Sequence, residues 1–449
     1  MVIALLVPYL NRNSASVLPL LLGTNAQASA LAHRAGLQLK QCAVNGRLLS
    51  QSLCVNSWDE KQTKAEPDVH LIILIHGWLG NPKEMDGLKE SLIEQSQIQM
   101  DNQNLQHDSN KESPSSLDRV VVHSVRCNDG KTSDGILAGG KRVAGEINEM
   151  IQEIWNTQSS QGSKTNIRLS MVGNSLGGLY GRFAVSEIDW TDQQQQRQQQ
   201  QAAQLIPHYF VTTATPHLGC GFQQTYLPLP RFIEHPIGNA MLRSGQDLFR
   251  LPGHPDIIQE MAFSPTFTTP LSKFHKRMAY ANAHGTDFQV PLPTAAFWGE
   301  TDSVHTLVEN EADATTDIPK GVALTLTTPK QDLAADGPKQ AIATSEEISK
   351  QLDQLGWTKV LIDVRHEMPI NLNNNDVASS SAPTGADAKQ QKQWTSKELL
   401  QMFDTGRLKS LPIGHMVMVA NSKNDFYRNM CKSGIPIMDY LAKEIINSI

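Results

Sequence analysis

One short stretch, residues 169–181 with the sequence LSMVGNSLGGLYG, restricts the fold of this chain more than any other. An apolar, β-prone run ends in the pattern Gly-x-Ser-x-Gly and continues into residues typical of a helix. Strand, tight turn and helix in this order are the context of a serine nucleophile elbow. Gly173 and Gly177 lack the Cβ atoms that would collide with the neighbouring strand and helix. The stretch therefore predicts an α/β sheet and makes Ser175 the candidate nucleophile.

The composition is that of an ordinary globular protein and argues against several classes of function. Hydrophobic residues make up 39% of the 449 residues and charged residues 19%, which is typical of a folded domain. A net charge of -6 offers no basic surface for nucleic acid. The five cysteines are widely spaced and form no Cys-x-x-Cys pair. We therefore expect no metal site, no disulfide framework and no cofactor.

Residues 1–65 form an N-terminal extension that has two interpretations. The first 58 residues contain no Asp or Glu, and their Arg and Lys lie among Ser, Ala and Leu, as in organelle transit peptides. A disordered tail or a poorly defined gene start explains the same composition. The chain contains no Asn-x-Ser/Thr sequon, which weakly favours an intracellular location.

Apolar runs and helical patterns alternate along residues 66–449, which we interpret as one domain. Continuous apolar runs are typical of strands buried on both faces of a parallel sheet. The expected strands are residues 70–75, 119–125, 167–172, 209–213, 278–283 and, as the last, 359–364; the expected helices include 140–155 and 435–449. This alternation predicts a mainly parallel, doubly wound sheet flanked by helices.

Polar or low-complexity segments interrupt this pattern and predict disordered loop insertions near residues 98–118, 192–204, 308–352 and 371–393. The second of them contains a glutamine tract, which lacks the apolar surface needed to order itself. Residues 220–275 differ from these insertions because they are apolar and rich in proline. They form either a cap over an apolar cleft or further packing on the core helices.

A serine nucleophile needs a histidine base that is oriented by a carboxylate. With an elbow of this type, the order along the chain is Ser, then Asp or Glu, then His. Asp287 directly follows the strand expected at 278–283, at the edge of the sheet where active sites lie. Asp302 follows a weaker strand, so we favour Asp287 as the acid. Aspartate in such loops often only caps a turn, and this alternative applies to both residues.

Two histidines compete for the role of base. His366 follows the expected last strand, and its position in the pattern favours it, while His415 lies later in the segment LPIGHMV. The other candidates do not follow a late strand, and we expect them to be structural: His217, His284 and His305.

An oxyanion hole requires two backbone N–H groups. One comes from Leu176, directly after the nucleophile. The other is expected from Trp78, in the loop HGWLGNP that follows the strand at 70–75.

Five segments in combination resemble the eukaryotic putative serine esterase family of α/β-hydrolases, which includes a fungal lipid-droplet phospholipase and plant lipase-like proteins. These segments are LIILIHGWLGNP, CNDGKTSDGILAGGKRVAGEI, LSMVGNSLGGLYGRFAV, FVTTATPHLG and RMAYANAHGTDFQVPLPTAAF. The resemblance implies an α/β-hydrolase fold with Ser175 as nucleophile, Asp287 as acid and His415, in a short aliphatic-Gly-His island, as base.

The function implied by this resemblance is hydrolysis of lipid esters, such as acylglycerols or phospholipids, through an acyl-enzyme on Ser175. We accordingly expect the protein to associate peripherally with a membrane or lipid droplet. Two alternatives use the same fold: an acyltransferase with the same triad, and a catalytically silent protein that binds lipid or a partner.

Overall fold

The computed structural model describes the following residues: 69–107, 119–159, 165–190, 203–221, 231–287, 289–298, 304–307, 321–331, 342–365, 393–395 and 413–447. The N-terminal extension (1–65), the glutamine tract and most of the insertion expected at 371–393 lie outside these ranges. So do residues 108–118.

Within the described residues nine strands form one sheet, in the order β2-β1-β3-β4-β5-β8-β7-β6-β9. The strands are β1 (Val69–Ile75), β2 (Arg119–Ser124), β3 (Ile167–Asn174), β4 (Leu205–Thr213), β5 (Lys276–Asn282), β6 (Val304–Leu307), β7 (Val322–Thr327), β8 (Thr358–Ile362) and β9 (Gln393–Thr395). The pairings β2-β1, β1-β3, β3-β4, β4-β5 and β5-β8 are parallel. The pairings β8-β7, β7-β6 and β6-β9 are antiparallel. The predicted mainly parallel sheet is confirmed.

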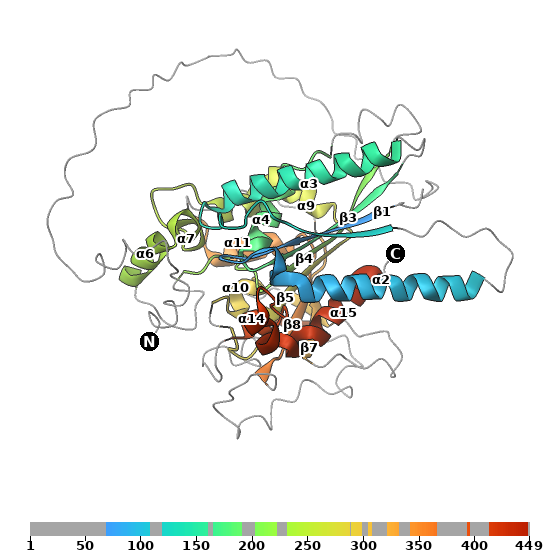
Figure 1. Ribbon diagram of the computed structural model, residues 1–449. Helices are drawn as coiled ribbons and strands as arrows, with labels where there is room; N and C mark the ends of the chain where they lie inside the picture. Colours follow the sequence, from blue (N-terminus) through green and yellow to red (C-terminus); the bar gives the residue numbers. More distant parts are fainter. Residues whose placement is uncertain are drawn as a thin grey trace, which may run out of the picture. The chain divides into compact units, whose positions relative to one another are not determined.

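Helices cover both faces of this sheet, as expected for a doubly wound fold (Figure 1). Every residue of β1 is buried, which explains its uninterrupted apolar sequence. One face carries α3 (Ile136–Ser159), α4 (Leu176–Ala184), α8 (Ile257–Phe263), α9 (Pro265–Ser272) and α11 (Ser345–Asp353). The other carries α2 (Asp86–His107), α10 (Leu292–Ala295), α13 (Gly414–Val417) and α15 (Ile435–Ile446).

The remaining short elements are η2 (Pro82–Met85), α6 (Arg231–Ala240), α7 (Leu242–Leu248), α14 (Asp425–Cys431) and η6 (Lys432–Gly434). The expected helices at 140–155 and 435–449 correspond to α3 and α15. On α3, Val143, Ile147 and Ile151 are buried while Glu149 and Glu153 are exposed, which is the pattern of an amphipathic helix.

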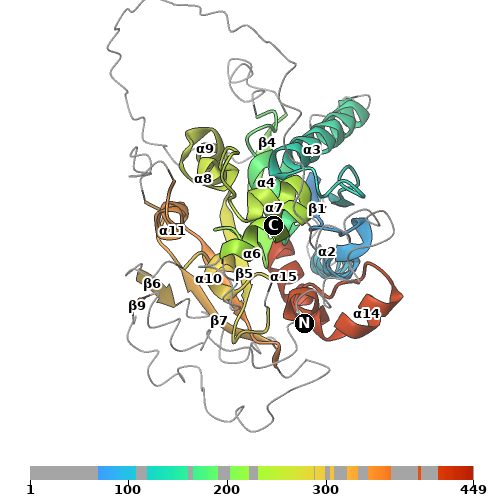
Figure 2. The ribbon, with the colours of Figure 1, turned by 90° about the vertical axis from the view of Figure 1, so that its left-hand side faces the viewer.

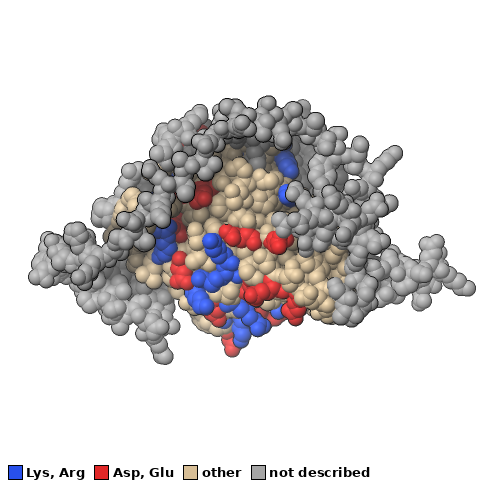
Figure 3. Space-filling view, turned by 90° about the horizontal axis from the view of Figure 1, so that it is seen from above, with Lys and Arg blue, Asp and Glu red and all other residues tan. Residues whose placement is uncertain are grey.

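Seen from above, acidic and basic side chains are mixed on the visible face (Figure 3).

The structure corrects two of the expected insertions. Residues 98–107 are not a loop but the second half of α2, whose first half is anchored in the core by Leu88 and Leu92. A helix anchored in this way extends through a polar sequence, because each added residue brings its own backbone hydrogen bond.

The segment 308–352 is also more ordered than its composition indicates. It contains β7 and α11, and a capping box between Thr344 and Glu347 starts the helix. Ile348 and Leu352 of α11 are buried in the core. The expectation that 359–364 is the last strand is wrong as well, since β9 follows β8 along the chain.

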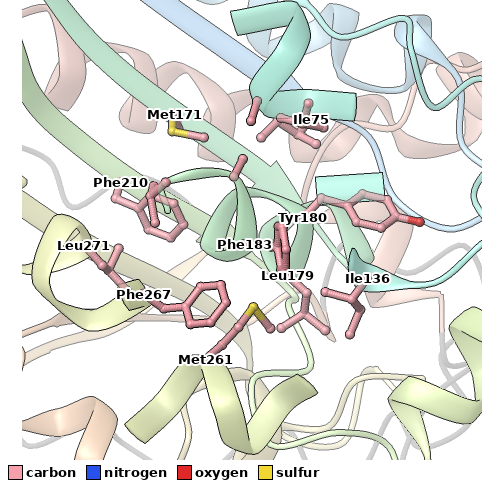
Figure 4. Packing of buried hydrophobic residues seen from close by; sticks show 14 of the residues in the cluster. Ile75, Ile136, Met171, Leu179, Tyr180, Phe183, Phe210, Met261, Phe267 and Leu271 are labelled. Carbon is pink, nitrogen blue, oxygen red and sulfur yellow. The ribbon is translucent and has the colours of Figure 1, made fainter. Parts of the chain in front are cut away.

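Residues 220–275 fold largely into helices α6 to α9, and α8 and α9 lie side by side (Figure 2). Met261 of α8 and Phe267 of α9 pack against α4, where the rings of Phe183 and Phe267 are 5.3 Å apart (Figure 4). The second half of the segment therefore packs on the core. Among the described helices, none is both long enough and apolar enough to cross a membrane.

Candidate active site

Ser175 occupies the turn between β3 and α4 with φ 53° and ψ -126°. Positive φ is strained for a residue that carries a side chain. The serine amide donates to Thr213 O at 2.8 Å, which ties the turn to the neighbouring strand. A Cβ on Gly173 would lie 2.5 Å from Gly178 Cα, and one on Gly177 would lie 2.1 Å from Ile75 O. Both glycines of the pattern are therefore required by close packing, as expected.

The loop that follows β1 contacts the elbow directly. A Cβ on Gly77 would lie 2.8 Å from Ser175 Cβ, so a side chain at this position would collide with the serine. Leu79 has φ 54°, and its carbonyl accepts from Lys423 Nζ at 3.0 Å. Lys423, in the segment that follows α13, therefore helps to hold this loop in place.

The amide of Trp78 differs from those around it. Its N–H has no hydrogen-bond partner within the described part of the chain. Neighbouring amides are all bonded: Gly77 N to Glu84 Oε1, Leu79 N to Thr132 Oγ1 and Gly80 N to Gly77 O. Leu176 begins α4, and N–H groups in the first turn of a helix have no partner inside the helix. These two amides are available to bind an oxyanion.

Asp287 and His415 form a buried pair, although 128 residues separate them in sequence. His415 Nδ1 donates to Asp287 Oδ2 at 2.8 Å, because an ionised carboxylate can only accept. The amides of Gln289 and Val290 donate to Asp287 Oδ1, both at 2.9 Å. The aspartate is only 1% exposed. Oδ1 therefore binds the loop backbone, while Oδ2 accepts from the imidazole and, at 3.3 Å, from Asn282 Nδ2.

The pairing depends on a glycine next to the histidine. Gly414 N donates to Thr286 O at 2.9 Å, and a Cβ at this position would lie 2.6 Å from the same oxygen. The Ile-Gly-His island of the sequence thus brings α13 into contact with the loop that carries the aspartate.

Burial lowers the pKa of His415, but the charge of Asp287 and the hydrogen bond to it raise this pKa, and the charge of Glu84 adds to the increase. The net pKa is raised. A base with a raised pKa holds a transferred proton more firmly.

The other candidate residues are placed as follows. His217 is fully buried and bonds Thr212 Oγ1 at 2.9 Å, and burial, followed by the charges of Arg182 and Lys359, lowers its pKa well below the ordinary value. His284 lies 3.8 Å from Asp363. His305 lies in β6, whereas Asp302 and His366 fall outside the described residues.

Three polar residues next to this centre were not expected from the sequence. Glu84 and Asn174 bond each other beside the elbow, and Thr132 binds Leu79 of the loop. Asn174 occupies the unspecified position, x, directly before the serine in the Gly-x-Ser-x-Gly pattern. No local signal marks Glu84 or Thr132, because their role depends on contacts made across the fold. Among the described residues, no group of three or more His, Cys, Asp or Glu side chains is placed to hold a metal ion.

A parallel sheet covered on both faces, with a serine at a strained strand-to-helix elbow, defines an α/β-hydrolase. The family model described as "Putative serine esterase (DUF676)" matches residues 65–297, which are 233 of the 449 residues. The chain belongs to this family and is a serine hydrolase. The matched residues include Ser175 and Asp287 but end before His415.

Two solved structures are similar at low identity. One is a lipase-esterase related protein from Clostridium acetobutylicum ATCC 824, at 13% identity over 47% of this chain and 74% of that chain, with a TM-score of 0.22. The other is RedJ with a PEG molecule bound in the active site, at 14% identity over 54% of this chain and 84% of that chain, also with a TM-score of 0.22. Comparison with curated proteins finds no match. The family assignment therefore rests on the sequence model.

Proposed function

We propose that this serine hydrolase is a carboxylic ester hydrolase of the lipase or esterase type, with Ser175, Asp287 and His415 as its catalytic triad. The observation that carries the proposal is the 2.8 Å hydrogen bond between His415 and Asp287. It joins a late histidine to an acid that follows a sheet strand, in the chain order that this type of elbow requires.

In this mechanism His415 Nε2 takes the proton of Ser175 Oγ while the oxygen attacks the ester carbonyl. The N–H groups of Trp78 and Leu176 stabilise the oxyanion of the tetrahedral intermediate. His415 then returns the proton to the leaving alcohol, which leaves an acyl group on Ser175. A water molecule gives a proton to His415 and attacks the acyl-enzyme. His415 passes this proton to Ser175 Oγ as the bond to the acyl group breaks, so that the carboxylic acid is released and both the serine and the neutral histidine are restored. Asp287 holds the imidazole in the required tautomer throughout.

For the substrate we propose a lipid ester, such as an acylglycerol or a phospholipid, and peripheral association with a membrane or lipid droplet. Support comes from the family resemblance and from the first half of the apolar segment 220–275, since the second half packs on the core. In α7 of this segment, Ser244 Oγ donates to Thr132 O at 2.6 Å, and Thr132 in turn binds Leu79. The segment is thus connected to the loop that is to bind the oxyanion.

The nucleophile is tested by labelling the purified protein with a fluorophosphonate probe. Wild type is expected to be labelled, and Ser175→Ala is expected to remain unlabelled. Equal labelling of both proteins, or of neither, would contradict the assignment.

The base and the substrate class are tested on a panel of p-nitrophenyl esters and phospholipids. His415→Ala is expected to abolish turnover, whereas His366→Ala is expected to keep it. Loss of turnover in His366→Ala alone would transfer the role of base to that residue. Product analysis with and without an added alcohol separates hydrolysis from acyl transfer.

A further inference from the structure

Glu84 is a buried carboxylate beside the nucleophile that takes no part in the mechanism above. It is 4% exposed and lies in η2, seven residues after Gly77. Its Oε1 accepts from Gly77 N at 3.0 Å and from Asn174 Nδ2 at 2.6 Å. One oxygen atom thereby joins the residue before Trp78 to the residue before Ser175. The two segments that flank the reacting groups share this single acceptor.

The surroundings of Glu84 are built to hold it in this position. A Cβ on Gly80 would lie 2.1 Å from Glu84 Oε2, so only glycine leaves room for the carboxylate. Thr213 Oγ1 donates to Asn174 Oδ1 at 3.0 Å, which orients the amide so that its NH₂ group faces Glu84. The backbone of Glu84 also accepts from Ser422 N at 3.2 Å, in the segment that follows α13.

The burial of this charge is unusual because no lysine or arginine within the described ranges forms an ion pair with it. An unpaired buried carboxylate is costly unless its hydrogen bonds or a nearby positive charge compensate it. In the proposed mechanism His415 becomes positively charged each time it takes a proton. A positive charge therefore forms in the catalytic centre at each of these steps, as it does whenever His415 is protonated.

We propose that Glu84 is a positioning residue of the catalytic centre: its shared acceptor oxygen holds the loop of Trp78 against the elbow of Ser175 and fixes a carboxylate beside that elbow. This inference rests on the proposed function.

The local charges agree in sign with this role. The ionisable groups in the loop after β1, in η2, in the loop after β5 and in the segment directly after α13 are His76, Lys83, Glu84, His284, Asp287 and Lys423. Of these, Asp287 and Glu84 raise the pKa of His415, against the effect of burial. Removal of the Glu84 charge should therefore lower this pKa, while Asp287 continues to orient the ring.

The test compares Glu84→Gln, which keeps the shape and the acceptor oxygen, with Glu84→Ala, which removes both. In Glu84→Gln the acid limb of the kcat/KM profile for a p-nitrophenyl ester is expected to shift about half a pH unit or more toward lower pH. In Glu84→Ala kcat is expected to fall about 100-fold, because the loop is no longer held. Glu94→Gln is the matched control: it makes the same charge change at an exposed position of α2 and should leave both quantities unchanged.

A second measurement separates this inference from the proposed function. The pKa of His415 is followed by NMR of its ring proton in Ser175→Ala, with and without Glu84→Gln, so that no turnover is needed. A lower pKa in the double variant supports the role of the charge. Identical titration curves would overturn it, whether or not the wild type hydrolyses esters. Unchanged kcat in Glu84→Ala would overturn the positioning role.

Discussion

The substitution Asp287→Asn should inactivate the enzyme by changing the tautomer of His415 without disturbing the fold. Oδ1 of Asp287 accepts from the amides of Gln289 and Val290, so an amide side chain must place its oxygen there. Its NH₂ group then takes the position of Oδ2 and points at His415 Nδ1. Asn282 Nδ2 also donates to Oδ2, at 3.3 Å. Because the buried Oδ1 of Asn282 has no hydrogen-bond partner among the described residues, this amide can turn over and accept instead.

In the variant, Nδ1 of His415 must accept a hydrogen bond, so the ring proton moves to Nε2. A ring in this tautomer cannot take the proton of Ser175. In serine proteases the same change from acid to amide lowers kcat about 10⁴-fold, which corresponds to about 5 kcal/mol of transition-state stabilisation. The backbone hydrogen bonds of the loop are kept, so the Tm should stay close to that of the wild type.

The assay is steady-state hydrolysis of a p-nitrophenyl ester together with the rate of fluorophosphonate labelling. Both rates should fall in Asp287→Asn, and both should be unchanged in Asp302→Asn. A variant Asp287→Asn that keeps kcat within tenfold of the wild type would refute the reasoning. Loss of activity in Asp302→Asn alone would assign the acid to that residue.

Three further predictions concern the stability of the fold. A Cβ on Gly177 would meet a backbone carbonyl of β1 at 2.1 Å, so Gly177→Ala should cost about 3 kcal/mol or prevent folding; Gly145→Ala, where nothing lies within 4 Å of the added Cβ, should leave the Tm unchanged or raise it. Lys359, which is fully buried, forms an ion pair with the buried Asp353 at 2.7 Å, and Lys359→Met should cost about 3–5 kcal/mol in urea denaturation. Adding Asp353→Leu should restore most of this loss, and failure to do so would mean that the cost is not electrostatic. Burial raises the pKa of Glu146, but the hydrogen bonds from its neighbours have the larger effect, and the net pKa falls from 4.5 to about 2. Its contribution to stability is therefore present above pH 4.5 and lost as the pH falls toward 2, so the difference in unfolding free energy between wild type and Glu146→Gln should shrink over that interval; a constant difference would contradict this.

Local sequence was sufficient for the features that depend on a few consecutive residues. The elbow at Ser175, the buried strand β1 and the amphipathic helix α3 each follow from composition and periodicity within a short window. Asp287 could be selected because an acid directly after a strand lies at a known edge of the sheet. The segment 308–352 shows where composition misleads: its average is polar, but β7 and α11 within it have ordinary strand and helix patterns.

The sequence by itself therefore determined the α/β class, the position of the serine and the glycines that the turn requires, because backbone sterics act between near neighbours. Only the tertiary structure decided which histidine approaches Asp287, since 128 residues separate the two and no local pattern sets that contact. The same holds for Glu84. A glutamate usually lies on the surface, and only the packing of η2 between the loop of Gly77 and the elbow makes this one a buried acceptor shared by both.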